Sequence, residues 1–248
     1  MFIKNHWQQK TASNGARTFL KILAPLEKKL AKNKPRKRKL VITISGEASV
    51  GKTVVGKILS TYFNLKLHNV GDKERHFAKK KKISLETASQ LLPKKIDLSV
   101  DKEALKLAIE GGCVIVGRLA AFTVGDWADC RILVTCEGKV RAERLARKFP
   151  PTADPPKAEK IFQKEALKKI KARDKADRKR YKKLYGLDLL NKNPYNLIID
   201  NTKPSLKEIK NIVIKKVEDF LSTFAKGYGG SPEALCEGGK NKNYGWPR

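Results

Sequence analysis

The chain of 248 residues is 40% hydrophobic, which is enough for one α/β domain with a buried core and for extensions at its ends. Its 55 Lys and Arg residues against 25 Asp and Glu give a formal charge of +30, so electrostatics alone attracts the chain to polyanions. No apolar run reaches the roughly 18 residues that a transmembrane helix needs, and the N-terminus lacks the apolar run of a signal peptide. We therefore expect a cytoplasmic protein without a membrane contact.

The two ends of the chain differ in composition from the middle. Residues 1–39 contain twelve Lys or Arg and a single acid, Glu27, so we expect a basic N-terminal arm. Residues 226–248 are rich in Gly and Asn, which predicts a C-terminal tail. The domain itself is expected at residues 40–225.

Strand and helix patterns alternate through this domain. Strands are expected at 40–45, 66–70, 113–117, 131–135 and 196–200. Helices are expected after residue 51 and at 85–92, 102–110, 140–148, 157–184 and 205–224. This alternation predicts a five-stranded parallel sheet covered on both faces, an α/β/α sandwich. The helix at 157–184 is strongly basic with few large apolar residues, so we expect it to project over the site and not to join the core.

Four cysteines, Cys113, Cys130, Cys136 and Cys236, show no C-x-x-C spacing. A cytosolic chain seldom keeps disulfides. Buried free thiols are therefore expected.

The segment between the first strand and the following helix has the form G-x-x-x-x-G-K-[ST], the pattern of a phosphate-binding loop. Its residues are Gly46, Glu47, Ala48, Ser49, Val50, Gly51, Lys52 and Thr53. Glycines let backbone N–H groups point at phosphates at a helix N-terminus. Lys52 can reach the same phosphates, and Thr53 can place its hydroxyl on Mg²⁺. The loop predicts a site for a nucleoside triphosphate. Glu47 is unusual in such a loop, because an acid close to a triphosphate is unfavourable unless its side chain points outward.

Three arginine-containing clusters occupy residues 71–75, 117–120 and 173–181. The first two follow strands, and the carboxyl ends of parallel strands are where ligands bind in an open α/β sheet. In the third, Arg173, Asp177 and Arg180 have the spacing i, i+4 and i+7 and share one helix face. Arginine forks bind phosphate in a bidentate manner. A solvated face of ion pairs would explain one such cluster alone, but three clusters beside a phosphate-binding loop favour a second anionic substrate.

These motifs and their order resemble the cytidylate kinases, in particular the short archaeal-type branch of that family of nucleoside monophosphate kinases. The resemblance covers about residues 40–222. It includes the phosphate-binding loop, GDKER at 71–75, ISLE at 83–86, Asp97 and Asp101, GRLA at 117–120, VRAER at 140–144, RDKADRKRYKKLYG at 173–186 and NLIIDNT at 196–202. It implies a P-loop kinase fold with a helical monophosphate-binding part at 72–101 and a basic lid at 145–185.

The resemblance also implies roles for single residues. Its reaction would transfer the γ-phosphoryl group of ATP, with Mg²⁺, to CMP or dCMP. Lys52 would act on the transferring group. The acceptor site would contain Asp72 and Asp101, and Asp177 would accept hydrogen bonds from the ribose. Four arginines, Arg75, Arg118, Arg173 and Arg180, would hold the acceptor phosphate, while Arg141 and Arg144 would close on the ATP phosphates.

Four residues depart from what cytidylate kinases commonly carry: Val70, Lys73, Glu74 and Val116. All lie near the expected acceptor site, so the preferred base is left open. The alternatives are a kinase for AMP or UMP, a basic ATPase that contacts RNA through the arm at 1–39, and a nucleotide binder without transfer activity. Relatives of this type are usually monomers, so a monomer is expected.

Overall fold

A computed structural model describes residues 39–147 and 155–227, together with residues 23, 25, 28 and 29; for residues 155–160 and 224–227 it describes the backbone only. Nearly all of the expected N-terminal arm, the expected tail beyond residue 227 and Cys236 lie outside the described residues. Within the described part, no helix is both long and apolar enough to cross a bilayer. Cys113 and Cys130 are buried free thiols as expected, and Cys136 is a half-buried free thiol.

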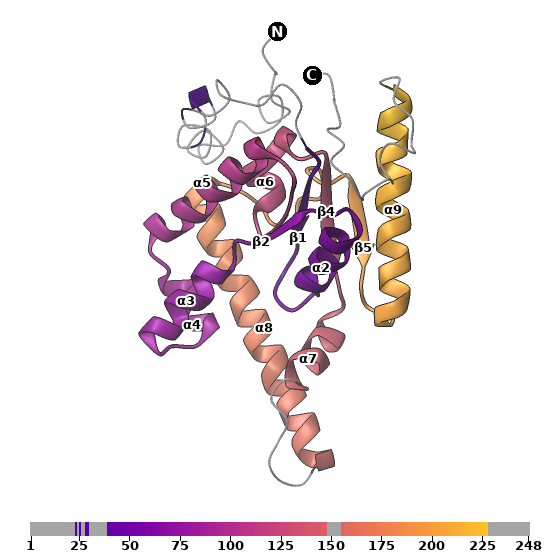
Figure 1. Ribbon diagram of the computed structural model, residues 1–248. Helices are drawn as coiled ribbons and strands as arrows, with labels where there is room; N and C mark the ends of the chain where they lie inside the picture. Colours follow the sequence, from indigo (N-terminus) through magenta and orange to yellow (C-terminus); the bar gives the residue numbers. More distant parts are fainter. Residues whose placement is uncertain (1–22, 24, 26–27, 30–38, 148–154, 228–248) are drawn as a thin grey trace.

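A five-stranded parallel sheet forms the centre of the molecule (Figure 1). Its strands are β1 (Val41–Ser45), β2 (Lys66–Asn69), β3 (Cys113–Val116), β4 (Cys130–Thr135) and β5 (Leu197–Asp200). The order across the sheet is β2-β3-β1-β4-β5, and every neighbouring pair is parallel. All five strands were predicted to within a residue at each end, because runs of Val and Ile bounded by turn residues are typical of buried parallel strands.

Helices cover both faces of this sheet, so the predicted three-layer α/β/α sandwich is confirmed. Alternate β1 residues point to opposite faces. Ile42 and Ile44 pack with α2 (Lys52–Tyr62) and α9 (Leu206–Gly227). Val41 packs on the other face, against α5 (Lys94–Glu110) and α6 (Ala120–Val124), which a 3₁₀ turn at Gly125–Trp127 follows.

Helix α5 begins about two turns earlier than the sequence predicted, and α6 was not predicted. The early part of α5 mixes Lys, Asp and Ser with its apolar residues, so its sequence does not stand out as helical. Helix α6 has only five residues, too few to show a helical period.

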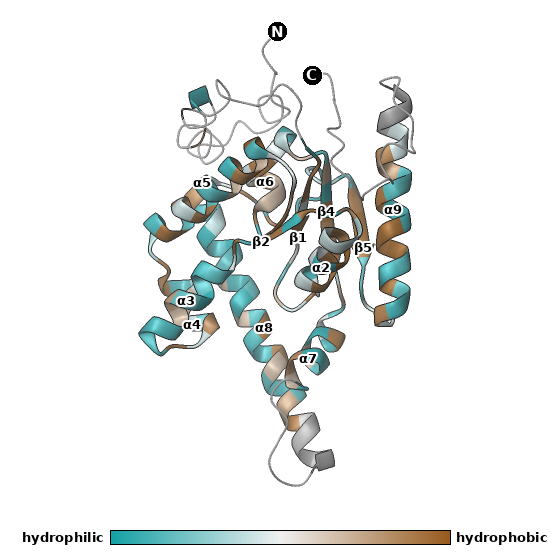
Figure 2. Ribbon diagram, in the orientation of Figure 1, coloured by the Kyte–Doolittle hydropathy of each residue, from teal (hydrophilic) through white to brown (hydrophobic). Residues whose placement is uncertain are grey.

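The long basic helix α8 (Pro155–Tyr185) corrects one prediction. Its early part runs away from the sheet beside α7 (Gly138–Ala146), as expected of a projecting element (Figure 1). Its last turns do belong to the core, because Tyr181 and Tyr185 are buried against the residues of α5 and α6. In Figure 2 the part of α8 beside α3 is mostly hydrophilic, so the many lysines conceal the two buried tyrosines in the sequence.

Two shorter helices, α3 (Asp72–Lys81) and α4 (Leu85–Leu91), connect β2 to α5. They lie beside α8 (Figure 1). Ser84 caps α4 by accepting a hydrogen bond from the Thr87 amide at 3.1 Å. Residues of α3, α4 and α8 line one space together with residues that follow β1, β2 and β3.

Candidate active site

The loop between β1 and α2 has a backbone that only glycine tolerates at two points. Gly46 and Gly51 have φ of +146° and +99°, in the region that favours glycine. A Cβ at Gly46 would overlap the carbonyl oxygen of Val134, and one at Gly51 would overlap the Asn201 side chain. Asn201 also donates a hydrogen bond to the carbonyl oxygen of Val50 at 2.9 Å. The loop is thus fixed by its neighbours, and its N–H groups lie at the start of α2, where anions bind.

Side chains from α7 and α8 hold this loop from its outer side. The buried Arg141 donates to the Ala48 carbonyl oxygen at 2.7 Å, to Glu47 at 2.9 Å and to Asp174 at 2.5 Å. Asp174 in turn accepts a hydrogen bond from the Ala48 amide at 3.2 Å. Arg178 forms a second ion pair with Glu47. We call Glu47, Arg141, Asp174 and Arg178 the loop clamp.

Two residues of the loop clamp, Glu47 and Arg141, were predicted to belong to the ATP site. The Glu47 carboxylate faces α7 and α8, where its charge is paired with Arg141 and Arg178. Arg141 was expected to close on the ATP phosphates, but all its guanidinium nitrogens contact the loop and Asp174. It therefore holds the loop and does not line the cavity, in contrast to Arg144, which does. Asp174 was not predicted as a site residue, although it stands next to Arg173 in the third arginine cluster.

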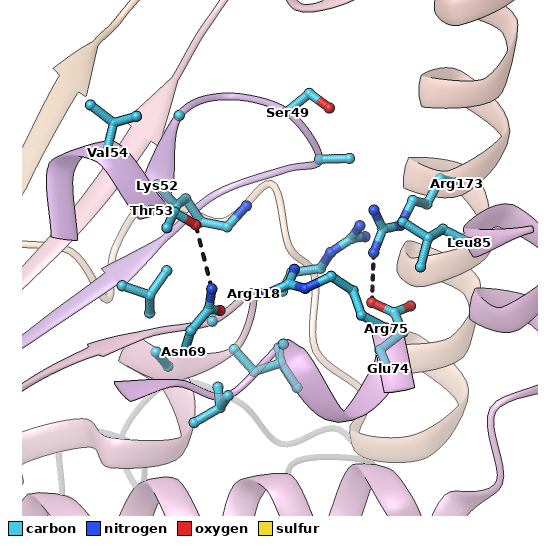
Figure 3. A pocket seen from close by; sticks show the side chains of 18 of the residues that line it. Ser49, Lys52, Thr53, Val54, Asn69, Glu74, Arg75, Leu85, Arg118 and Arg173 are labelled. Atoms are coloured by element: carbon cyan, nitrogen blue, oxygen red, sulfur yellow. Dashed lines mark hydrogen bonds and ion pairs between the residues drawn. The ribbon is translucent and has the colours of Figure 1, made fainter. Parts of the chain in front are cut away.

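A cavity of about 730 Å³ connects the loop with the arginine clusters. Residues of the loop and of the start of α2 line one end: Ala48, Ser49, Gly51, Lys52 and Thr53. Arginines from four segments border the rest: Arg75, Arg118, Arg144, Arg147, Arg173 and Arg180. Figure 3 shows the Lys52 side chain pointing from the loop toward Arg118 and Arg173. The two predicted halves of the site thus form one cavity; Arg147 was not predicted.

Lys52 lies in a strongly positive environment. Burial, followed by the charges of Arg118 and Arg173, lowers the pKa of its ammonium group. The pKa of the Arg118 guanidinium is lowered to about 10, mainly by burial and then by Arg173, so this group is still charged at neutral pH. A cavity with this excess of positive charge favours a ligand with several negative charges.

Ion pairs order the arginines at the other end, which we call the acceptor end. Arg118 pairs with Asp177, and Arg180 lies 3.1 Å from Asp177 and 3.3 Å from Asp97. Asp177 is fully buried and does not line the cavity. Its predicted contact with a ribose therefore needs a movement of these arginines.

The other two arginines of the acceptor end, Arg75 and Arg173, pair with acids of α3. Arg75 donates from Nε to Asp72 at 2.9 Å, an exposed contact within one turn. Arg173 donates to Glu74 at 2.7 Å and bridges α8 to α3. Of the four residues that depart from the family pattern, Val70, Glu74 and Val116 line the cavity, whereas Lys73 lies outside it and pairs with Glu103.

Asp101 lies at the wall of the cavity near α6. It accepts a hydrogen bond from the Thr123 hydroxyl at 2.9 Å and another from Tyr185. Burial raises the pKa of Asp101 to about 7, although both hydrogen bonds oppose the rise. The sequence predicted Asp101 but missed Thr123 and Tyr185, because their contact with it depends on how α6 and α8 pack on α5.

The residues present fit a magnesium ion that is bound mainly through phosphates. The Thr53 hydroxyl lines the cavity beside Lys52, and it accepts only a long hydrogen bond, 3.5 Å, from Asn69. The described residues form no cluster of three or more His, Cys, Asp or Glu side chains that could hold a metal. Mg²⁺ typically keeps several waters and substrate phosphates and uses one or two protein ligands.

A parallel sheet with a phosphate-binding loop after its central strand, joined in one cavity to an arginine-rich end, defines the chain as a P-loop protein of the kinase type. Residues 41–203 match the model of the cytidylate kinase-like family. The cytidylate kinase of Pyrococcus horikoshii is 38% identical over 179 residues, which are 71% of this chain and 88% of that protein. The cytidylate kinase of Methanocaldococcus jannaschii is 31% identical over 186 residues, 73% of this chain and 99% of the relative. The chain therefore belongs to the cytidylate kinase-like family.

A comparison with solved structures agrees on the fold. An uncharacterized protein from Eubacterium ventriosum matches with a TM-score of 0.51 over 73% of this chain and 99% of its own. At 18% sequence identity this likeness supports the fold alone.

Proposed function

We propose that the chain is a nucleoside monophosphate kinase that transfers the γ-phosphoryl group of ATP to CMP or dCMP. One observation carries the proposal: a single cavity has the phosphate-binding loop at one end and Arg75, Arg118, Arg173 and Arg180 near the other. Two phosphorylated substrates can thus lie in the same space with their phosphates facing each other. The relatives named cytidylate kinase support cytosine as the base of the acceptor.

The donor would bind at the loop. Backbone N–H groups of residues 49–53 and the Lys52 ammonium would bind the β- and γ-phosphates. Arg144 lines the cavity on α7 and is the lid arginine that can reach the same phosphates. With ATP the site would hold Mg²⁺ through Thr53, and the ion would supply neutralisation of charge on the phosphates.

Catalysis would need no protein nucleophile. In phosphoryl transfer the transition state is loose, so positioning and charge stabilisation supply most of the rate enhancement. Lys52 would stabilise the transferring group, while the arginines of the acceptor end hold the acceptor phosphate in line.

A panel of acceptors with ATP and Mg²⁺ tests the proposal. ADP formation would be measured with AMP, UMP, CMP or dCMP and without any acceptor. We expect CMP or dCMP to accelerate ADP formation the most, by at least an order of magnitude over no acceptor. Equal rates with and without every acceptor would contradict kinase activity, and a preference for AMP or UMP would contradict the assigned base.

A further inference from the structure

Glu74 is an acid enclosed by the arginines of the acceptor end. It lies in the first turn of α3, and only 8% of its surface is exposed. Its carboxylate accepts hydrogen bonds from the Ser89 hydroxyl at 2.6 Å and from Arg173 at 2.7 Å. Arg180 approaches the same carboxylate to 3.7 Å. Figure 3 shows the Arg173 contact at the edge of the cavity.

This carboxylate is held in its charged form. Burial by itself would raise the pKa of Glu74, but the charges of Arg118 and Arg173 and the hydrogen bond from Ser89 outweigh it and lower the pKa to about 2. Glu74 therefore carries a full negative charge throughout the neutral range.

The position of Glu74 differs from that of the neighbouring acids. Asp97 and Asp177 pair with Arg180 but do not line the cavity. Among the acids that the structure describes, Glu74 is the one that both lines the cavity and pairs with arginines that line it.

Several donors of these arginines are already in use. Arg173 directs Nη2 to Glu74 and Nε toward Ser89. Arg180 donates from Nη1 to the Ser89 carbonyl oxygen and from Nη2 to the Tyr181 hydroxyl. A phosphate that takes over these bonded donors must displace an existing partner, and of these partners Glu74 is the anion that lines the cavity.

We infer that Glu74 is an internal anion that competes with the acceptor phosphate for Arg173 and Arg180, and so weakens the affinity of this chain for its acceptor. The inference rests on the proposed placement of the acceptor phosphate. A phosphate at these arginines either displaces the carboxylate or remains close to it, and both outcomes cost free energy because like charges repel. Glu74 thereby raises the concentration of acceptor at which the site is half filled.

The Glu74→Gln variant tests this. Glutamine has nearly the same shape but no charge. Its carbonyl oxygen can still accept the hydrogen bond from Arg173, while its amide NH2 faces the Ser89 hydroxyl, which can act as the acceptor. We expect CMP and inorganic phosphate to bind about 5- to 20-fold more tightly in calorimetric titrations without ATP. The KM for CMP falls by a similar factor, while the KM for ATP changes less than about twofold.

Glu103→Gln is the matched control. Glu103 is an exposed acid on α5 that pairs with Lys73 outside the cavity, so its removal changes the net charge equally. We expect no change in the affinity for phosphate or CMP. If both variants gain affinity for phosphate equally, the gain comes from the change in net charge and the inference is overturned.

Unchanged or weaker binding in the Glu74→Gln protein would also overturn it, since Glu74 would then serve to order the arginines. If that variant does not fold, Glu74→Asp, which withdraws the carboxylate by one methylene, must show a smaller gain in the same direction. Phosphate titration separates this inference from the kinase assignment. If the chain phosphorylates no nucleotide but Glu74→Gln binds phosphate more tightly than the wild type, the proposed function fails and the competition by Glu74 is still supported.

Discussion

The two ends of the cavity are built in different ways. The loop end is fixed by backbone geometry, by the positive φ of Gly46 and Gly51 and by close contacts with neighbouring strands, and the loop clamp buttresses it. The acceptor end consists of charged side chains from α3, from the segment after β3 and from α8, held by ion pairs between residues 59 and 99 positions apart. The residues that line the first end are thus contiguous in sequence, although the loop clamp that holds them comes from α7 and α8. The second end depends on side-chain ion pairs, which the acceptor phosphate of the proposed function would have to replace in part.

The loop lysine should give the largest effect. Lys52→Ala removes the charge that stabilises the transferring group, so we expect turnover to fall by at least about 10²–10³-fold. Lys57→Ala changes an exposed lysine on the same helix, and its turnover should match the wild type. Steady-state ADP formation measures both, and turnover above a tenth of the wild-type rate in Lys52→Ala would contradict the role of this residue.

Breaking the loop clamp should cost stability and ATP binding together. Arg141→Ala leaves Asp174 buried without its main partner, so the free energy of unfolding should fall by about 3–5 kcal/mol. The KM for ATP should rise more than the KM for CMP. Arg144→Ala, three residues away, removes only a 3.6 Å contact with the Cys136 sulfur and should change stability by less than about 1 kcal/mol. Denaturant titration and kinetics at a temperature where both variants are folded measure these effects, and equal stability of the two variants would argue against the clamp.

At the acceptor end the effect should be smaller and confined to one substrate. Arg180→Ala removes one charge-assisted contact, worth about 1.5–3 kcal/mol, so the KM for CMP should rise roughly 10- to 150-fold while the KM for ATP changes little. Lys179→Ala removes an exposed neighbouring charge and serves as the control. A larger effect on ATP than on CMP would place Arg180 at the wrong end of the cavity.

The smallest effect concerns stability against pH. The pKa of Asp101 is about 7 in the folded chain and about 3.9 in an unfolded chain, so between these values the folded state retains a proton that the unfolded state has lost. The free energy of unfolding should therefore fall as the pH rises from 4 to 7. Asp101→Asn should reduce that fall by roughly 1–2 kcal/mol between pH 5 and 7. Burial also raises the pKa of Asp97, to about 6. Part of the fall in stability with pH therefore remains in the Asp101→Asn variant.

Asp219→Asn, on the exposed surface of α9, is the control for this series. Its stability should follow the wild-type curve. Parallel curves for Asp101→Asn and the wild type would show that Asp101 does not retain its proton in the folded state.

The same contrast explains what the sequence could predict. The five strands, the sandwich and the loop depend on local patterns, such as Val and Ile runs and a fixed glycine spacing, and all were predicted. The arginines of the acceptor end were predicted by resemblance, and the structure brings them to one cavity. The contacts of Arg141 with the loop were not predicted, because its position in VRAER does not reveal that it folds back onto the loop. The core position of Tyr181 and Tyr185 was missed because lysines dominate the composition of α8.

Transfer of label from ATP to the acceptor tests the central claim most directly. Incubation of the full chain with Mg²⁺, CMP and ATP labelled at the γ-phosphate should place the label in the β-phosphate of CDP, at a rate that matches ADP formation. Label that accumulates as inorganic phosphate, at a rate independent of CMP, would contradict a cavity that joins a donor and an acceptor.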